Sequence, residues 1–345
     1  MAKPQLLYAA FDTGPSNYGL DVITYAQRKM NWGVVYAGNN SGVGLDLVWN
    51  LDFDYAIVGG PSSFENGVDR QILEFCHDHK KPVFVLGNSP RSILRPGVEG
   101  RINHATAIVA SPSDVELAKA FGYKDAVWLG YPSHWADPAK MKPSTIFMSD
   151  AYHRAGLHIF VCGLKEAEIT DSMLASVIDA AQYEDATIYF QAHPSEIEKT
   201  KNATRRNELL KHSNVIEFTS RENVASLMLA CPLTVCTGGA TGIIEGALLR
   251  LPVVYYMDDQ VMAYMKKASN DEIFGPVAAG ACEIATADTM ASVVHMLLWD
   301  PVANAKLRAA QEAAFPHQPE GLNVLEEIFT YIQNPSGYVP YALRS

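Results

Sequence analysis

The chain has 345 residues, of which 48% are hydrophobic and 19% are charged, a composition typical of a globular protein. Its length exceeds what one hydrophobic core usually holds and indicates two domains of about 150 residues each. The formal net charge of −11, with no continuous basic stripe, argues against a duplex-DNA-binding protein, because such a protein needs concentrated Lys and Arg to replace phosphate counterions.

Apolar runs and helical stretches alternate through the first 130 residues. Strands alternating with helices predict βαβ units and a parallel sheet. Most of these strands run into Gly, Pro, Ser, Asn or Asp, residues that would line the edge where open α/β sheets bind ligands. The expected strands are 6–11, 33–37, 55–58, 82–86, 107–110 and 127–129, and the expected helices are 19–30, 67–79 and 113–121.

The pattern restarts after a proline-containing linker at residues 132–144. The basic cluster at 199–211 is interpreted as the solvated face of a helix. The expected strands are 157–161, 187–191, 215–218, 233–236 and 253–256, and the expected helices are 170–182, 199–212, 221–230, 241–249, 288–298, 301–314 and 320–333.

The predicted fold class is therefore α/β, with two Rossmann-like, doubly wound domains in tandem and a cleft between them. Residues 1–135 are expected to form the first domain and residues 145–318 the second. Residues 319–345 are expected to form a helix and tail that pack across the junction.

The strongest local motif is the segment from Thr237 to Glu245, with the sequence TGGATGIIE. A strand leads into a Gly-rich turn, and the turn leads into a helix whose first N–H groups have no internal acceptors. With the helix dipole these groups form an anion site, and the glycines let a pyrophosphate approach the backbone. Glu245, about one turn into the helix, can accept hydrogen bonds from ribose hydroxyls. The alternative is an ordinary strand–helix corner with Glu245 as a surface acid.

Residues 233–256 resemble the donor-binding segment of GT-B glycosyltransferases, above all the lipid-linked N-acetylglucosaminyltransferase of peptidoglycan synthesis. The matching positions are Cys236, residues 238–240, Glu245, Ala247, Leu251, Pro252 and Tyr255. The resemblance is detailed over about residues 155–265 and extends to the first domain only in outline.

The resemblance implies a nucleoside-diphosphate sugar as donor substrate, with a UDP-sugar as the first choice, and no bound cofactor. The turn would face the diphosphate, Glu245 would hold the ribose, and Phe218 and Thr219 would border the nucleobase. Asp259 and Gln260 are the candidate sugar contacts. The implied nucleotide-binding residues are Gly163, Phe218, Thr219, Thr237, Gly238, Gly239, Ala240, Thr241, Glu245, Asp259 and Gln260.

His193 and Asp12 are the candidate catalytic residues. His193 follows a strand in the second domain, where an imidazole can assist departure of the diphosphate; the alternative is a capping or core histidine. Asp12 lies where an inverting transferase needs a base for the acceptor hydroxyl, although a carboxylate at a βα corner is also an ordinary helix cap. The expected loop at residues 14–17 departs from the Gly-rich loop of the peptidoglycan enzyme.

The sequence gives little indication of a metal site, a membrane span or disulfide bonds. His77 and His79 point to different faces of a helix, so no metal site is expected. The five cysteines form no CxxC pair, the N-terminus lacks a signal-peptide hydrophobic region, and no apolar run reaches the ~20 residues of a membrane span. A cytoplasmic protein is expected.

The predicted function is glycosyl transfer to an acceptor hydroxyl, by a metal-independent GT-B-type enzyme. The acceptor is open between a glycan, a small molecule and a modified DNA base, and no oligomeric state is assigned. The alternatives are a nucleotide-sugar 2-epimerase, a polyol-phosphate transferase of the same fold, and a non-catalytic nucleotide-sugar-binding protein.

Overall fold

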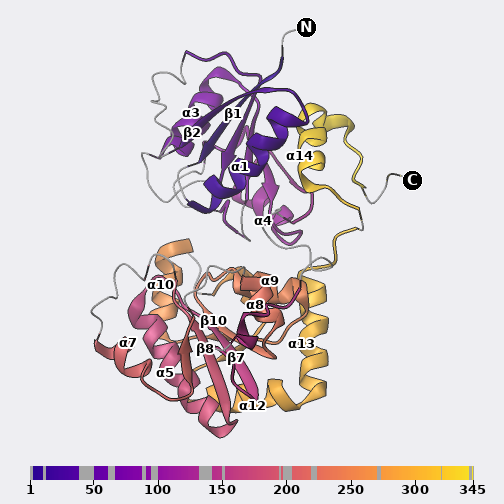
Figure 1. Ribbon diagram of the computed structural model, residues 1–345. Coiled ribbons are helices and arrows are strands. Elements are labelled where there is room, and N and C mark those ends of the chain that lie inside the picture. The colour runs from indigo at the N-terminus through magenta and orange to yellow at the C-terminus, as the bar shows by residue number, and fades with distance from the viewer. Residues whose placement is uncertain are drawn as a thin grey trace. The chain divides into compact units, whose positions relative to one another are not determined.

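The computed structural model divides into two compact units (Figure 1). Unit 1 contains Met1–Trp135 and Gln318–Ser345, and unit 2 contains Ala136–His317. The structure describes residues 3–10, 13–38, 50–60, 67–87, 91–94, 100–131, 142–149, 152–193, 196, 204–218, 224–269, 273–319, 321–341 and 344. No helix within these ranges is both long enough and apolar enough to cross a membrane.

Unit 1 is built on a six-stranded parallel sheet in the order β2-β1-β3-β4-β5-β6. Parallel strands covered on both faces read as continuous apolar runs rather than alternating ones, and β1 is buried almost throughout. The strands are β1 (Gln5–Ala10), β2 (Gly33–Gly38), β3 (Tyr55–Gly59), β4 (Val83–Leu86), β5 (Thr106–Val109) and β6 (Asp125–Trp128).

The helices of unit 1 cover both faces of this sheet. Leu7 and Ala9 of β1 face a core shared with α3 (Val68–His79) and α4 (Asp114–Phe121). Leu6 and Tyr8 face a second core shared with α1 (Thr13–Arg28) and α14 (Val324–Gln333), followed by η3 (Pro335–Gly337). Helix α14 (yellow in Figure 1) comes from the far end of the chain and yet lies against α1.

Helix α1 begins six residues earlier than the sequence predicted, at Thr13 instead of residue 19. The backbone at residues 14–17, expected to be a loop, is therefore helical, and this expectation was wrong. Pro15 is the third residue of the helix, where its missing N–H leaves no helical hydrogen bond unmade, so proline does not prevent an early start. Asp12 lies outside the described residues.

Unit 2 is built on a second parallel sheet, in the order β12-β11-β10-β7-β8-β9. The chain starts in the centre at β7, proceeds to β9 on one side, and then crosses back to β10. The carboxyl ends of β7 and β10 therefore flank a topological switch point, where open α/β sheets bind ligands. The strands are β7 (Leu157–Cys162), β8 (Ala186–Gln191), β9 (Val215–Glu217), β10 (Leu233–Thr237), β11 (Val253–Tyr256) and β12 (Glu283–Ala285).

Helices also cover both faces of the unit 2 sheet. Helices α5 and α12 pack against each other and against β10, and α8 packs against α9. The bounds are η2 (Ile146–Met148), α5 (Ala167–Tyr183), α7 (Thr204–Leu209), α8 (Val224–Leu229), α9 (Gly242–Leu249), α10 (Asp259–Ser269), α11 (Gly275–Ala278), α12 (Met290–Trp299) and α13 (Pro301–Ala314).

Candidate functional site

The candidate site is the set of turns that follow β7, β8 and β10 at the switch point of unit 2. These turns contain residues 163–166, 192–193 and 238–241. The first and third turns touch, because a Cβ added to Gly238 would lie 2.8 Å from a terminal carbon of Leu164. It would also lie 3.3 Å from the ring of Tyr264 in α10, so three elements meet around this glycine.

Gly238 and Gly239 play different roles in the turn after β10. Gly238 has a φ of +59°, and neighbouring side chains occupy the space that a Cβ would need. The fold itself therefore requires glycine here. Nothing lies within 4 Å of the position that a Cβ on Gly239 would occupy. The open side of the turn is therefore at Gly239, and Thr241, at the start of α9, is also exposed.

Gly238→Ala is expected to lower the free energy of unfolding by about 2 kcal/mol, because it combines a left-handed φ with a steric clash. Gly239→Ala is the matched control and is expected to change stability by less than about 0.5 kcal/mol. Urea denaturation followed by circular dichroism measures both. Equal losses in the two variants would contradict the assignment of a packing role to Gly238 alone.

Thr237 is committed to the sheet. It is fully buried, and its hydroxyl donates to the carbonyl oxygen of Tyr256 in β11 (2.7 Å). A role for the Thr237 side chain in contacting a ligand is therefore not supported by its position.

Glu245 lies in the first turn of α9, and its charge is near enough to raise the pKa of the Cys162 and Cys236 thiols in β7 and β10. Its Oε2 is enclosed and has no hydrogen-bond partner among the described residues. Burial raises the pKa of Glu245 to about 7. The side chain thus presents a dehydrated acceptor whose ionised form is costly until donors reach it.

His193 follows β8 and is half-buried. Burial lowers its pKa, and the positive charge of Lys165 lowers it further, so both favour the neutral imidazole. Lys165 itself is exposed, lies 5.9 Å from the ring centre of Tyr264, and places a cation beside the turns. Sequence reasoning missed Lys165 and Tyr264; the position of Lys165, two residues after Gly163, was the available signal.

The other predicted nucleotide contacts lie partly in the core and partly on the surface of unit 2. Phe218 is only 2% exposed and packs against the rings of Phe147 (5.6 Å) and Tyr152 (5.0 Å), so its side chain belongs to the core. Asp259 and Gln260 are exposed in the first turn of α10. Thr219 lies outside the described residues.

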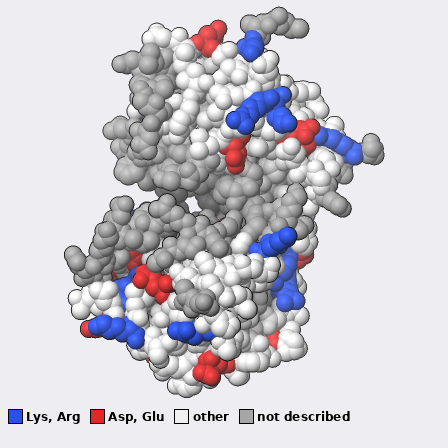
Figure 2. All heavy atoms as spheres, in the orientation of Figure 1, with Lys and Arg blue, Asp and Glu red and all other residues white. Residues whose placement is uncertain are grey.

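The basic cluster expected to be solvated is in part buried. Arg206 of α7 is 3% exposed and pairs with Asp171 and Glu196, so the prediction of a solvated face was wrong at this position. The helical period alone does not reveal that two buried carboxylates lie opposite one of its arginines. Figure 2 shows that on the visible face the described Lys and Arg residues lie in separate groups among Asp and Glu.

The cysteine and metal chemistry of the described residues is limited. Burial raises the pKa of all five thiols, so none is a nucleophile at neutral pH. Within the described ranges, no group of three or more His, Cys, Asp or Glu side chains is arranged to hold a metal ion.

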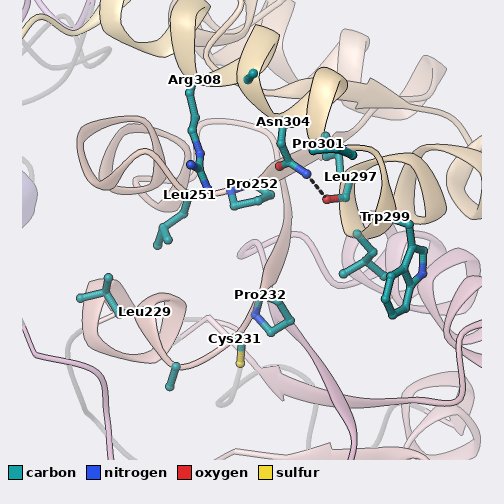
Figure 3. A pocket seen from close by; sticks show the side chains of 13 residues that line it. Leu229, Cys231, Pro232, Leu251, Pro252, Leu297, Trp299, Pro301, Asn304 and Arg308 are labelled. Atoms are coloured by element: carbon teal, nitrogen blue, oxygen red, sulfur yellow. Dashed lines mark hydrogen bonds between the residues drawn. The ribbon is translucent and has the colours of Figure 1, made fainter.

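A separate groove lies at the opposite, amino edge of the unit 2 sheet (Figure 3). It runs between the residues preceding β10 and β11 and the helices α12 and α13. In its wall Asn304 donates to the carbonyl oxygen of Leu297 (2.6 Å), and Arg308 points toward Leu251. Because Pro232 and Pro252 precede their strands whereas the candidate turns follow theirs, this groove is not part of the candidate site.

Unit 1 carries a buried carboxylate near the ends of its own strands. Asp114 is 2% exposed and accepts the backbone N–H of Arg91 (2.7 Å). Burial raises the pKa of Asp114 to about 6, although the Arg91 contact opposes this rise.

The Asp114 carboxyl is expected to make unit 1 less stable as the pH rises. A group whose pKa is higher in the folded state favours folding below its unfolded pKa, near 3.9, and loses that contribution as the pH passes 6. The loss amounts to about 3 kcal/mol. Asp114→Asn keeps an acceptor for Arg91 and is expected to remove this dependence, whereas the exposed control Asp78→Asn is not. Urea denaturation from pH 4 to pH 8 compares them, and parallel curves for wild type and Asp114→Asn would refute the effect.

Neither the protein-family models nor the curated proteins contain a match to this sequence. Solved structures, by contrast, share its fold over nearly its whole length. A Methanocaldococcus jannaschii UDP-GlcNAc 2-epimerase in complex with UDP-GlcNAc and UDP is 12% identical, with a TM-score of 0.57 over 95% of this chain and 99% of that one.

Two further similar structures are a glycosyltransferase and a UDP complex. A glycosyltransferase from Rickettsia africae is 12% identical, with a TM-score of 0.59 over 97% of this chain and 100% of that one. The Anabaena protein HepE, in complex with UDP and glucose, is 14% identical, with a TM-score of 0.58 over 95% and 99%. At these identities the similarity shows the fold alone, and it confirms the predicted fold of two Rossmann-like α/β domains.

Proposed function

We propose that the chain is a glycosyltransferase that moves a sugar from a nucleoside-diphosphate sugar to an acceptor hydroxyl, with a UDP-sugar as the first donor to test. The observation that carries this proposal is the buried carboxylate of Glu245. Its enclosed oxygen has no partner among the described residues, and it lies in the first turn of the helix that follows a Gly-rich turn at the switch point of a Rossmann-like sheet. A ribose diol supplies the two donors that such a carboxylate needs.

The diphosphate is assigned to the open side of the turn, over Gly239, Ala240 and Thr241. The positive end of the α9 helix dipole and the exposed cation of Lys165 offset its charge there. In the transfer step the acceptor oxygen attacks the anomeric carbon, the bond from that carbon to the diphosphate oxygen breaks, and the nucleoside diphosphate leaves. The neutral His193 is proposed to donate a hydrogen bond to the departing diphosphate.

The remaining sequence assignments are retained as parts of this proposal. Asp12 is proposed to take the proton of the acceptor hydroxyl. The backbone at Phe218 and Thr219 is proposed to border the nucleobase, because the Phe218 side chain is enclosed in the core. Asp259 and Gln260 are proposed to contact the sugar from the start of α10, where both are exposed. Gly163 is proposed to border the phosphates through its backbone.

A nucleotide-sugar 2-epimerase is the second candidate. The observation that favours it is the similarity in fold to the Methanocaldococcus jannaschii UDP-GlcNAc 2-epimerase over 95% of this chain. The transferase is placed first because residues 233–256 resemble the donor segment of glycosyltransferases. An epimerase converts its nucleotide sugar without any acceptor, which gives a direct way to separate the two candidates.

The first test of the proposal is binding. Thermal unfolding is followed with a panel of nucleoside diphosphates and nucleotide sugars, for wild type and for the control Asp179→Asn, which removes an exposed carboxylate of α5. A ligand at 100 times its dissociation constant adds about 2.7 kcal/mol of stability. Absence of any shift in both folded proteins would refute the donor site.

The second test is turnover, followed by NMR with each nucleotide sugar that binds. Acceptor-dependent release of the nucleoside diphosphate with a new glycosidic linkage supports the transferase. Appearance of the 2-epimer without an acceptor establishes the second candidate instead. Transfer of the sugar phosphate together with release of a nucleoside monophosphate identifies a polyol-phosphate-type transferase. Binding without turnover across sugars and acceptors identifies a non-catalytic binding protein.

A further inference from the structure

Three elements of unit 2 are joined by a buried ionic cluster made of Asp171, Glu196 and Arg206. The Arg206 side chain comes from α7 and pairs with Asp171 of α5 through Nε. Its Nη2 pairs with Glu196 Oε1 at 2.5 Å and lies 3.4 Å from the carbonyl oxygen of Ala167, at the start of α5. The guanidinium plane also lies 4.8 Å from the ring centre of Phe190 in β8. One arginine therefore links α5, α7 and the segment after β8.

Glu196 connects this cluster to the candidate site. Its backbone N–H donates to the carbonyl oxygen of His193 (2.8 Å), so the two residues are linked directly. Its Oε2 lies 3.3 Å from the position that a Cβ on Gly163 would occupy. The carboxylate thus lies directly behind both the turn after β7 and the turn after β8.

The packing around Gly163 leaves little room for a side chain at this position. Its N–H donates to the carbonyl oxygen of Gln191 (2.8 Å), and an added Cβ would lie 3.2 Å from that oxygen and 3.2 Å from Thr170 Cγ2. Together with Glu196, these contacts leave the turn after β7 little freedom to shift. The two turns are therefore fixed to each other and to the arginine.

Stability alone does not account for such a cluster. Glu196 is 0% exposed, and burial raises its pKa, while the neighbouring Arg206 charge lowers it. Buried ion pairs are often no more stable than apolar residues of the same volume, because the charges lose their hydration. A guanidinium nevertheless fixes the direction of two carboxylates at once through its planar set of donors. What the cluster provides is a fixed geometry at the candidate site.

We infer that Arg206 and Glu196 are positioning residues, which hold the His193 turn against the Gly163 turn so that both face the diphosphate. The inference rests on the proposed function, because that function assigns the diphosphate to these turns. Neither residue touches the substrate in this arrangement. Asp171 balances the charge of Arg206 from the α5 side, and its own charge raises the pKa of Glu196.

The variants that test this inference differ in which contact they remove. Glu196→Ala removes the link to the arginine but leaves Arg206 paired with Asp171, so the remaining charges are balanced and the protein is expected to fold. Glu196→Gln keeps an acceptor of the same length and is the conservative variant. Asp171→Asn removes a carboxylate from the same cluster on the side away from His193, and is the matched control.

Two readouts separate positioning from a general structural role. The first is the pKa of His193, from the NMR titration of its ring C–H, assigned by its disappearance in His193→Gln. The second is the affinity for UDP, measured by calorimetry. In Glu196→Ala the His193 pKa is expected to rise toward the ordinary 6.5 and UDP binding to weaken at least 10-fold. In Glu196→Gln and in Asp171→Asn the affinity for UDP is expected to stay within about twofold of wild type. The pKa of His193 is expected to stay within about 0.2 of the wild-type value.

An unchanged His193 pKa in folded Glu196→Ala would overturn the inference, as would the same change in Asp171→Asn. Failure of the proposed function has a different signature. If wild type binds neither UDP nor any other nucleotide, the donor site is refuted, while the His193 titration still reports whether Glu196 and Arg206 hold that turn.

Discussion

A protein carrying Glu245→Gln is expected to bind its nucleoside diphosphate about 100-fold more weakly than wild type. Hydrogen bonds to an ionised group are worth about 1.5–3 kcal/mol each, and replacing the carboxylate weakens the bonds from both ribose hydroxyls. A loss of about 3 kcal/mol corresponds to a factor of roughly 100 in the dissociation constant. Isothermal titration calorimetry with UDP measures the change, and Asp179→Asn is expected to bind as wild type does.

The same variant is expected to unfold less readily than wild type above pH 7 when no ligand is present. Because burial raises the pKa of Glu245 to about 7, this carboxyl stabilises the fold below its unfolded pKa and loses that contribution as the pH rises through 7. Removing the charge avoids a cost of at most about 3 kcal/mol at pH 8. Opposite signs for affinity and stability are typical of a residue kept for function rather than for folding.

Nucleotide binding by wild type is also expected to strengthen as the pH rises from 6 to 8, because the ionised carboxylate is the better acceptor. Binding near pH 7 then releases a proton from Glu245. Calorimetry in two buffers with different ionisation enthalpies detects this release. If Glu245→Gln showed the same proton release and the same affinity as wild type, Glu245 would not be the ribose-binding group.

Much of this architecture could be predicted from the sequence, since the strands of a parallel sheet are short apolar runs that end on turn-forming residues. The runs at 55–58, 187–191 and 253–256 correspond to β3, β8 and β11 within a few residues. The Gly-rich turn after β10 was also correctly placed before a helix. In each case the decisive signal lies within about ten neighbouring residues.

The failures concern contacts that no local pattern encodes. Arg206 was interpreted as solvated because the surrounding helix is polar, yet its partners lie 10 and 35 residues away in the chain. The sequence also does not show that the Phe218 side chain packs against the rings of Phe147 and Tyr152. Helix α1 starts at Thr13 rather than at residue 19, because the first turn of a helix tolerates the proline at position 15.

The packing of the final helix, α14, also depends on residues that are far away in the sequence. Its apolar face predicts that α14 packs on something, but nothing local to residues 324–333 shows which surface receives it. In the structure Ile328, Phe329 and Ile332 are at most 1% exposed and lie in the core shared with Tyr8 and Tyr18 of unit 1. The fold of unit 1 is therefore complete only when the end of the chain is present.

Phe329→Ala is accordingly expected to destabilise unit 1 by about 3–5 kcal/mol, the usual cost of truncating a buried phenylalanine. The Phe329 ring stacks on Tyr25 (5.6 Å between centres) and meets Trp32 edge-on (5.3 Å), so its loss leaves a cavity lined by two rings. Calorimetric unfolding measures the effect as a fall in the midpoint of the unit 1 transition, with the unit 2 transition unmoved. Val302→Ala, at an exposed position of α13 in unit 2, is the control and is expected to change neither transition.

A shift of both transitions in Phe329→Ala would mean that the two units unfold as one cooperative block. A shift of neither would mean that α14 contributes little to the core that encloses it. The expected result, a change confined to unit 1, follows from its burial because the described partners of Phe329 all belong to that unit. Nucleotide-dependent stabilisation should then persist in Phe329→Ala at temperatures below the first transition, since Glu245 and the turns after β7, β8 and β10 lie in unit 2.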